Sequence, residues 1–265
     1  MSEALTALAA LYQNRAKVVD TKIAAINTQI SDGKKVLNAT QQTEVANLSK
    51  KVTSYATPEA SIKNAKSVVS LAQTGLTSVT GYLKQMMQMA QMASAPGISS
   101  SDSTAFNIRF LAIFNKIGKA ASDSSLNGSN LLSGTAGLNV NTGLTKDAAS
   151  RMHINPVNVF GMMTAGVLTG VSIDNPRKAT QALTQISSAL TQVKNGEAAL
   201  RIANTTLDKK TAEIKTKLDT SLSEIKAMES VDVKKLQEQL KDLYFQQKIN
   251  YNIVSQLNNS ASSSL

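Results

Sequence analysis

The chain has 265 residues, of which 42% are hydrophobic but only 4% aromatic, and it contains no tryptophan and no cysteine. The lack of cysteine excludes thiolate catalysis, thiolate metal sites and disulfide bridges. The formal net charge of +10 has no arginine cluster or aromatic stacking set beside it. The lysines between 209 and 248 alternate with acidic residues, which is typical of solvated helix faces, so we expect no nucleic-acid partner.

Residues 3–31 predict a first helix. Apolar residues recur in steps of three and four, including Leu5, Leu8, Ile23 and Ile26, until Asp32-Gly33 ends the pattern. No basic region leads this stretch, so we expect no cleaved secretory signal. Residues 33–57 are more polar and predict a partly extended connector with one short helix near residues 44–52.

A long helix is predicted over 58–95, with Thr57 as its N-cap, Pro58 at its first position and Pro96-Gly97 after its end. Counting in heptad-like steps from Ile62 meets only apolar residues. We therefore expect a packed rod helix, with these core residues: Val69, Leu76, Leu83 and Met86. Ser99 to Asp102 predicts the cap of a further helix, with Phe110 and Ile117 on its buried side.

The middle of the chain lacks a helical period. Residues 122–134 predict a polar turn centred on Asn127-Gly128, and residues 135–173 predict two to four short strands. The most apolar window, about 157–173, is too short for a bilayer and is interrupted by glycines. We therefore expect no membrane span.

Asn175-Pro176 predicts the start of a long helix that reaches about Met228, with Leu190, Leu207 and Leu218 in the rod core. A last helix is predicted over 232–258. One of its sides carries Leu240, Leu243, Val254 and Leu257, and another carries Phe245, Ile249 and Ile253. A helix with two apolar sides presents more apolar surface than one partner helix covers. We therefore favour a polymer over the alternative, an ordinary bundle within one monomer.

The candidates for chemistry are weak. Met86, Met87, Met89 and Met92 suit adaptable packing better than a soft-metal site. His153 is the one histidine and has no carboxylate pair near it in the sequence. The phosphate-binding motifs G-x-x-x-x-G-K-[ST] and G-x-G-x-x-G do not occur in the sequence. We expect no enzymatic activity, no cofactor and no metal site.

Four segments, in order along the chain, resemble bacterial flagellins. Residues 30–36 are similar to the flagellin element L-S-S-G-x-R-I, and residues 64–74 to N-A-N-D-G-I-S-L-A-Q-T. Residues 124–134 resemble the turn T-x-F-N-G-x-x-L-L-x-G, and residues 240–257 resemble the closing amphipathic helix. The resemblance extends over about 1–134 and 173–265.

The resemblance implies a mainly α, elongated, flagellin-like helical bundle or coiled coil with a small β-rich insert at about 135–173. Residues 1–57 would form an N-terminal inner-tube helix and connector, and 231–265 the C-terminal inner-tube helix. Residues 58–134 and 174–230 would form the two halves of a helical rod domain. The eight expected assembly residues lie on the terminal stripes: Leu5, Leu8, Ile23, Ile26, Leu240, Leu243, Val254 and Leu257.

The implied function is that of a flagellin, a structural subunit that polymerises with itself into the extracellular flagellar filament for motility. The resemblance also implies type III export and three kinds of partner: an export chaperone, the filament cap and hook–filament junction proteins. One alternative is a junction protein that links hook to filament, which the Asn127-Gly128 turn disfavours. Another is a flagellin-like cell-surface protein that binds an anionic polysaccharide through its basic charge.

Overall fold

The computed structural model describes residues 2–145 and 147–262. These form two units, which we call the terminal unit (described residues 2–51 and 219–262) and the central unit (described residues 52–145 and 147–218). Helices account for most of both units, and the strands form two small two-stranded sheets. The predicted mainly α fold class with a small β-containing insert is confirmed.

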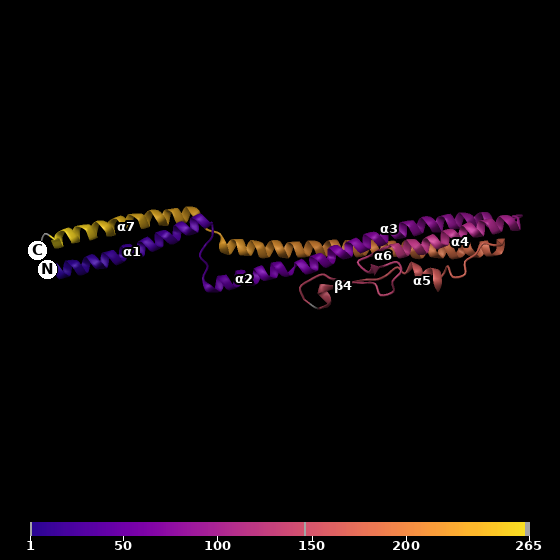
Figure 1. Cartoon of the computed structure of the whole chain (residues 1–265), viewed down its shortest axis with the longest axis horizontal. Helices are drawn as coiled ribbons and strands as arrows, with labels where there is room; N and C mark the ends of the chain where they lie inside the picture. Colours follow the sequence, from indigo (N-terminus) through magenta and orange to yellow (C-terminus); the bar gives the residue numbers. More distant parts are fainter. Residues whose placement is uncertain (1, 146, 263–265) are drawn as a thin grey trace. The chain divides into compact units, whose positions relative to one another are not determined.

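The terminal unit contains α1 (Ser2–Asp32) and α7 (Val233–Ser262), which lie side by side and antiparallel (Figure 1). Gly33, with φ +64°, ends α1 in the left-handed conformation that glycine adopts without strain. The chain after it is held by the end of α6 (Pro176–Glu229), because the Lys35 backbone N–H donates to the Glu229 carbonyl at 2.7 Å. The Lys34 ammonium also lies 3.1 Å from the Glu229 carboxylate.

The connector is more helical than the sequence predicted, because α2 extends over Ala39–Ser54. Asn38 and Gln41 form a reciprocal cap at its start. The Gln41 N–H donates to Asn38 Oδ1 at 2.9 Å, and the Asn38 N–H donates to Gln41 Oε1 at 3.2 Å. This cap satisfies helix-end donors that would otherwise lack a partner. No residue of α2 is buried, which explains why an apolar period did not indicate it.

The central unit is built on α3 (Ala56–Ala93), α4 (Ser100–Asp123) and residues 176–218 of α6, whose last residues, 219–229, belong to the terminal unit. The predicted N-cap of α3 is wrong. The helix begins one residue before Thr57, and Tyr55, whose backbone is in the right-handed helical region, occupies the cap position. Two other start signals are confirmed, since Ser99 accepts a hydrogen bond from the Asp102 N–H and Asn175 accepts one from the Lys178 N–H.

Short elements cover the helices of the central unit. β1 (Ser125–Leu126) and β2 (Ser129–Asn130) form one antiparallel hairpin, and β3 (Leu138–Asn141) and β4 (Arg151–Ile154) form another. The insert is only partly strand. A 3₁₀ turn, η1 (Ala148–Ser150), precedes β4, and the helix α5 (Val159–Thr164) occupies a segment for which strands were predicted. Asn158 caps the start of α5, because its side-chain oxygen accepts a hydrogen bond from the Gly161 N–H at 2.9 Å. The sequence analysis missed this cap because the segment around it is rich in glycine.

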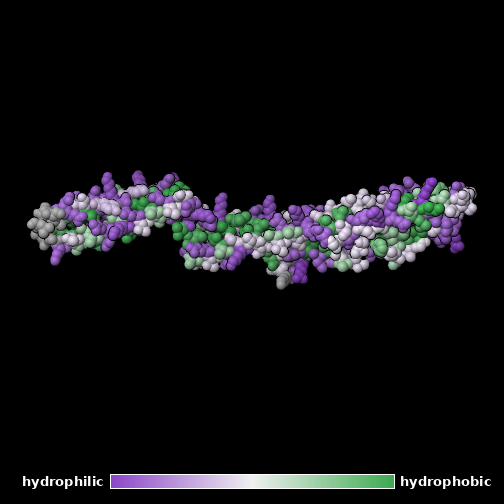
Figure 2. Space-filling model, in the orientation of Figure 1, coloured by the Kyte–Doolittle hydropathy of each residue, from purple (hydrophilic) through white to green (hydrophobic). Residues whose placement is uncertain are grey.

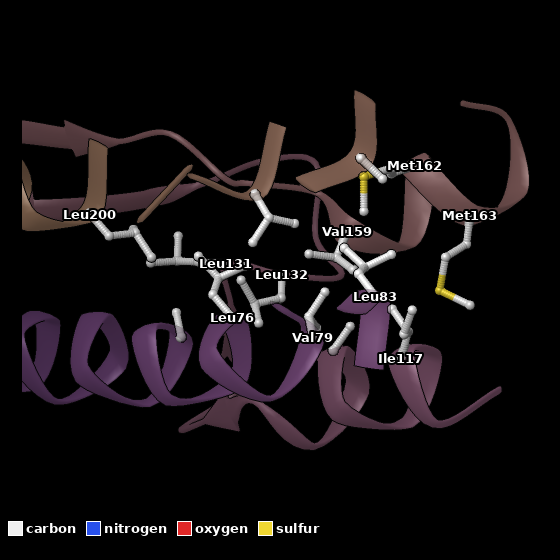
Figure 3. Packing of buried hydrophobic residues seen from close by; sticks show 14 of the residues in the cluster. Leu76, Val79, Leu83, Ile117, Leu131, Leu132, Val159, Met162, Met163 and Leu200 are labelled. Carbon is white, nitrogen blue, oxygen red and sulfur yellow. The ribbon is translucent and has the colours of Figure 1, made fainter. Parts of the chain in front are cut away.

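One apolar core runs through the central unit. Figure 3 shows Leu76, Val79 and Leu83 of α3 pointing toward residues of the neighbouring elements. These neighbours are Ile117 of α4, Val159, Met162 and Met163 of α5, Leu200 of α6, and Leu131 and Leu132 after β2. Within the described residues, no helix is both long and apolar enough to cross a bilayer.

Candidate assembly interface

The contact between α1 and α7, which we call the α1–α7 seam, is formed by apolar residues at heptad-like spacing. Ile23 and Val254 are buried in it. The other predicted assembly residues are less covered. Leu5, Ile26, Leu240, Leu243 and Leu257 are half-buried, and Leu8 is 41% exposed. The pair thus buries the centre of its seam and leaves the rest of its apolar surface partly open.

Apolar side chains also stand outside the seam on both helices. On α1, Leu11 is 47% and Val18 is 55% exposed, and on α7, Phe245 is 67% and Ile249 is 40% exposed. Figure 2 shows apolar patches among hydrophilic side chains on the visible face of this pair. The predicted second side of α7 is therefore uncovered at Phe245 and Ile249, whereas Ile253 is half-buried.

Shallow grooves run along one side of the pair. One, of about 470 Å³, is lined by Leu11, Val18 and Val19 of α1 and by Gln246, Ile249 and Asn250 of α7, with Asn14 and Arg15 at its edge. A second groove, of about 460 Å³, shares Gln246 and continues toward Gln29 and Gln239. The uncovered residues Leu11, Val18 and Ile249 therefore lie on the same side of the pair.

A polar contact interrupts the seam. The Asp20 carboxylate accepts a hydrogen bond from the Gln247 amide at 2.7 Å and another from the Tyr251 hydroxyl at 2.7 Å. The hydrogen bond from Gln247, and to a lesser degree the one from Tyr251, holds the pKa of Asp20 below its usual value. The hydrogen bond to the carboxylate raises the pKa of Tyr251. Sequence reasoning missed this contact. Its signal was the presence of Gln247 and Asn250 where the apolar spacing of α7 calls for apolar residues.

The predicted rod-core residues all lie in the central unit. Five are buried: Val69, Leu76, Leu83, Met86 and Leu207. Leu190 and Leu218 are half-buried and pack against the same core. The rim of this unit carries an ion pair between the Lys66 ammonium and the Asp208 carboxylate, 2.5 Å apart, which joins α3 to α6.

The Asn127-Gly128 turn closes the β1–β2 hairpin. Both residues have positive φ, 51° and 76°, as a two-residue type I′ turn requires. The Asn127 amide donates to Asn64 Oδ1 at 2.6 Å. Two of the segments that resemble flagellin, 64–74 and 124–134, therefore meet in space.

Asn130 holds the hairpin on the end of α4. Its amide nitrogen donates to the carbonyls of Ala121 at 2.8 Å and Ser122 at 3.1 Å. Its amide oxygen accepts from the backbone N–H groups of Leu132 at 2.7 Å and Ser133 at 2.9 Å. One side chain thus satisfies carbonyls at the C-terminus of a helix and amides of the following loop.

The structure assembles no chemical centre from the candidates weighed above. His153 Nδ1 lies 2.7 Å from Asn139 Oδ1 across the β3–β4 hairpin. Among the described residues, no three histidine or acidic side chains are placed to hold a metal ion. Of the four methionines in the sequence cluster, Met86 is buried, Met87 and Met89 are half-buried against the core, and Met92 is 46% exposed.

No protein-family model matches the sequence, and a search of curated proteins finds no match. Among solved structures, a Bacillus cereus flagellin is similar with a TM-score of 0.51 and 18% identity, covering 58% of this chain and 88% of that chain. A putative flagellar hook-associated protein from Vibrio parahaemolyticus aligns with a TM-score of 0.46 and 16% identity, over 77% of this chain and 98% of that one. The chain therefore has a flagellin-like fold.

Proposed function

We propose that the chain is a flagellin, a structural subunit that polymerises into the bacterial flagellar filament. The observation that carries this proposal is the apolar surface that α1 and α7 leave uncovered after pairing with each other. Leu11, Val18 and Phe245 are each about half or more exposed, at 47%, 55% and 67%. The flagellin-like fold and the contact between Asn64 and Asn127 support the same assignment.

Assembly follows from this uncovered surface. Contiguous exposed apolar residues mark interaction sites, because burying them removes apolar area from water. A neighbouring copy offers the same residues, and contacts between different faces of identical subunits build an open helical tube when the rotation does not close. A two-helix pair of this kind buries little surface by itself, so its ordering is coupled to assembly.

The remaining parts of the proposal follow from the flagellin resemblance. The chain would be exported in an unfolded state by the flagellar type III apparatus, guarded by an export chaperone. It would be placed under the filament cap, beyond the hook–filament junction proteins, and would act outside the cell. Alternation of lysines with acidic residues on the helices suits a solvated surface in that setting.

The test is electron microscopy of the purified protein, seeded with short filament fragments or precipitated with ammonium sulfate. We expect long tubes of uniform diameter. Leu243→Asp places a charge in the half-buried α1–α7 seam, and Phe245→Asp places one on the exposed side of α7. Both should abolish tubes while the central unit stays folded, because neither residue belongs to its core.

The matched control is Lys234→Gln, which changes an exposed residue in the first turn of α7 and should leave tube formation intact. A wild-type protein that stays monomeric and is trimmed by protease to the central unit would overturn the filament proposal. That result would favour a junction protein or a polysaccharide-binding surface protein. Normal tubes from both aspartate variants would show that assembly does not use α7.

A further inference from the structure

The α7 side of the seam has a polar layer in its middle. Residues of α7 reach the seam in alternating steps of four and three, at Leu236, Leu240, Leu243, Gln247, Asn250, Val254 and Leu257. All of these are buried or half-buried, and Gln247 and Asn250 are the polar members. Apolar residues flank the polar layer on both sides, so apolar contact alone distinguishes poorly between pairings shifted by one heptad.

Asp20 supplies the matching polar group from α1. Gln247 Nε2 donates to Asp20 Oδ1, and the Tyr251 hydroxyl, one turn further along α7, donates to Asp20 Oδ2. Each carboxylate oxygen therefore has its own donor, in bonds of 2.7 Å. Hydrogen bonds to a charged acceptor are among the stronger ones in proteins. The Gln247 bond is partly buried, so losing it costs more than losing the exposed Tyr251 bond, which water replaces in part.

We propose that Asp20 is the positioning residue that sets the register of α1 against α7. If α7 slid by seven residues, Leu240 or Val254 would replace Gln247 opposite the carboxylate, depending on the direction of the slide. One carboxylate oxygen would then face an apolar side chain, whereas most of the apolar contacts would be replaced by equivalent ones. A single polar contact within an apolar helix pair fixes register in this way, because only one alignment satisfies it.

The register matters for assembly, and in that respect the inference deepens the proposed function. Leu11, Val18 and Ile249 line one groove only in the observed alignment of the helices. A slide by one heptad would move α7 by about 10 Å along α1. The exposed apolar residues of the two helices would then no longer form the same surface.

The test is disulfide trapping in the full chain, which is clean because the natural sequence has no cysteine. Asp20 meets Gln247 in the antiparallel helix pair, so Gln29, nine residues further along α1, lies close to residue 238 of α7. Gln29→Cys with Gln239→Cys therefore reports the observed register. Gln246 lines the same groove about 10 Å further along α7, so Gln29→Cys with Gln246→Cys reports the slide of one heptad that brings Val254 opposite Asp20. A slide of that size exceeds the reach of a disulfide, so each pair reports one register. Both pairs are oxidised in soluble protein and in protein precipitated with ammonium sulfate.

We expect only the first pair to cross-link when Asp20 is present. In Asp20→Leu the second pair should appear, and the ratio of observed to shifted cross-link should fall at least about tenfold. Asp20→Asn keeps one acceptor oxygen and should retain most of the observed register. Asp32→Leu is the matched control, since it removes the same charge from an exposed position at the end of α1.

The double variant Asp20→Leu with Gln247→Leu distinguishes an effect of Asp20 on the register of the helices from an effect on their stability. This double variant should be at least as helical as the wild type but should show both cross-links, which a purely stabilising role of Asp20 does not predict. An unchanged ratio in Asp20→Leu, or no cross-link of the first pair in either preparation with Asp20 present, would overturn the inference. Tube formation by electron microscopy is scored separately, so failure of the filament proposal leaves the register result readable.

Discussion

Replacing Asn130 by alanine should destabilise the central unit by about 2–4 kcal/mol. The side chain makes four hydrogen bonds, two from its amide nitrogen and two to its amide oxygen. Two of the partner groups, the Ala121 carbonyl and the Leu132 N–H, belong to buried residues, and each would cost about 1–3 kcal/mol when left without a partner. Ser122 is exposed and Ser133 is half-buried, so water replaces much of what their backbone groups lose.

The measurement is urea unfolding of the full chain followed by far-ultraviolet circular dichroism. Hydrogen exchange of peptides from α3 and α4 assigns the change to the central unit. Asn64→Ala is the control. It removes another asparagine of this region, but one whose hydrogen bond to Asn127 is exposed, so the loss in stability should stay below about 1 kcal/mol.

The result that would refute the reasoning is an Asn130→Ala protein within about 0.5 kcal/mol of the wild type, a difference typical of surface substitutions. Equal costs for Asn130→Ala and Asn64→Ala would also refute it, because burial of the partner groups would then not decide the magnitude. If the α4 peptides lost protection from hydrogen exchange while the α3 peptides did not, the destabilisation would be confined to the end of α4.

Three further predictions follow, one on close packing and two on pH. In Gly75→Ala the new Cβ would overlap Ser124 Oγ and lie 2.6 Å from Leu132 Cδ1. We therefore expect a loss of about 1–3 kcal/mol in the free energy of unfolding by urea, partly recovered by adding Ser124→Ala. A Gly75→Ala protein as stable as the wild type would contradict this. The Gln247 and Tyr251 donors lower the pKa of Asp20 from its ordinary 3.8, so their stabilisation of the α1–α7 pair is fully present above that pH and is lost as the pH falls through the lowered pKa. Hydrogen exchange of α1 peptides should show this loss in acid but not in Asp20→Asn, and an identical acid response of the two proteins would contradict it. The pKa of Tyr251 is raised from 10.0, so its contribution is present below that pH and is lost as the pH rises through the raised pKa, and Tyr251→Phe should abolish this alkaline response.

The sequence predicted the helices well where an apolar period or a capping residue indicated them. The heptad positions of α3 and the start signals at Ser99 and Asn175 are local features, because they depend on residues three or four apart. The errors occurred where the signal was polar or short. Asn38 and Gln41 cap a helix that has no buried residue, and Asn158 starts a helix of six residues. Apolar periodicity indicates neither of these helices.

The sequence by itself determined the five long helices α1, α3, α4, α6 and α7, which of their sides are apolar and where the Asn127-Gly128 turn lies, because these properties depend on neighbouring residues. Only the tertiary structure decided which groups meet. Asp20 and Gln247 are 227 residues apart, and Asn64 and Asn127 are 63 apart. Contacts at such separations depend on how helices are paired and aligned, and an apolar stripe is compatible with several alignments. The structure was therefore needed to show that a polar contact lies inside the α1–α7 seam and that Leu11, Val18 and Ile249 stay uncovered beside it.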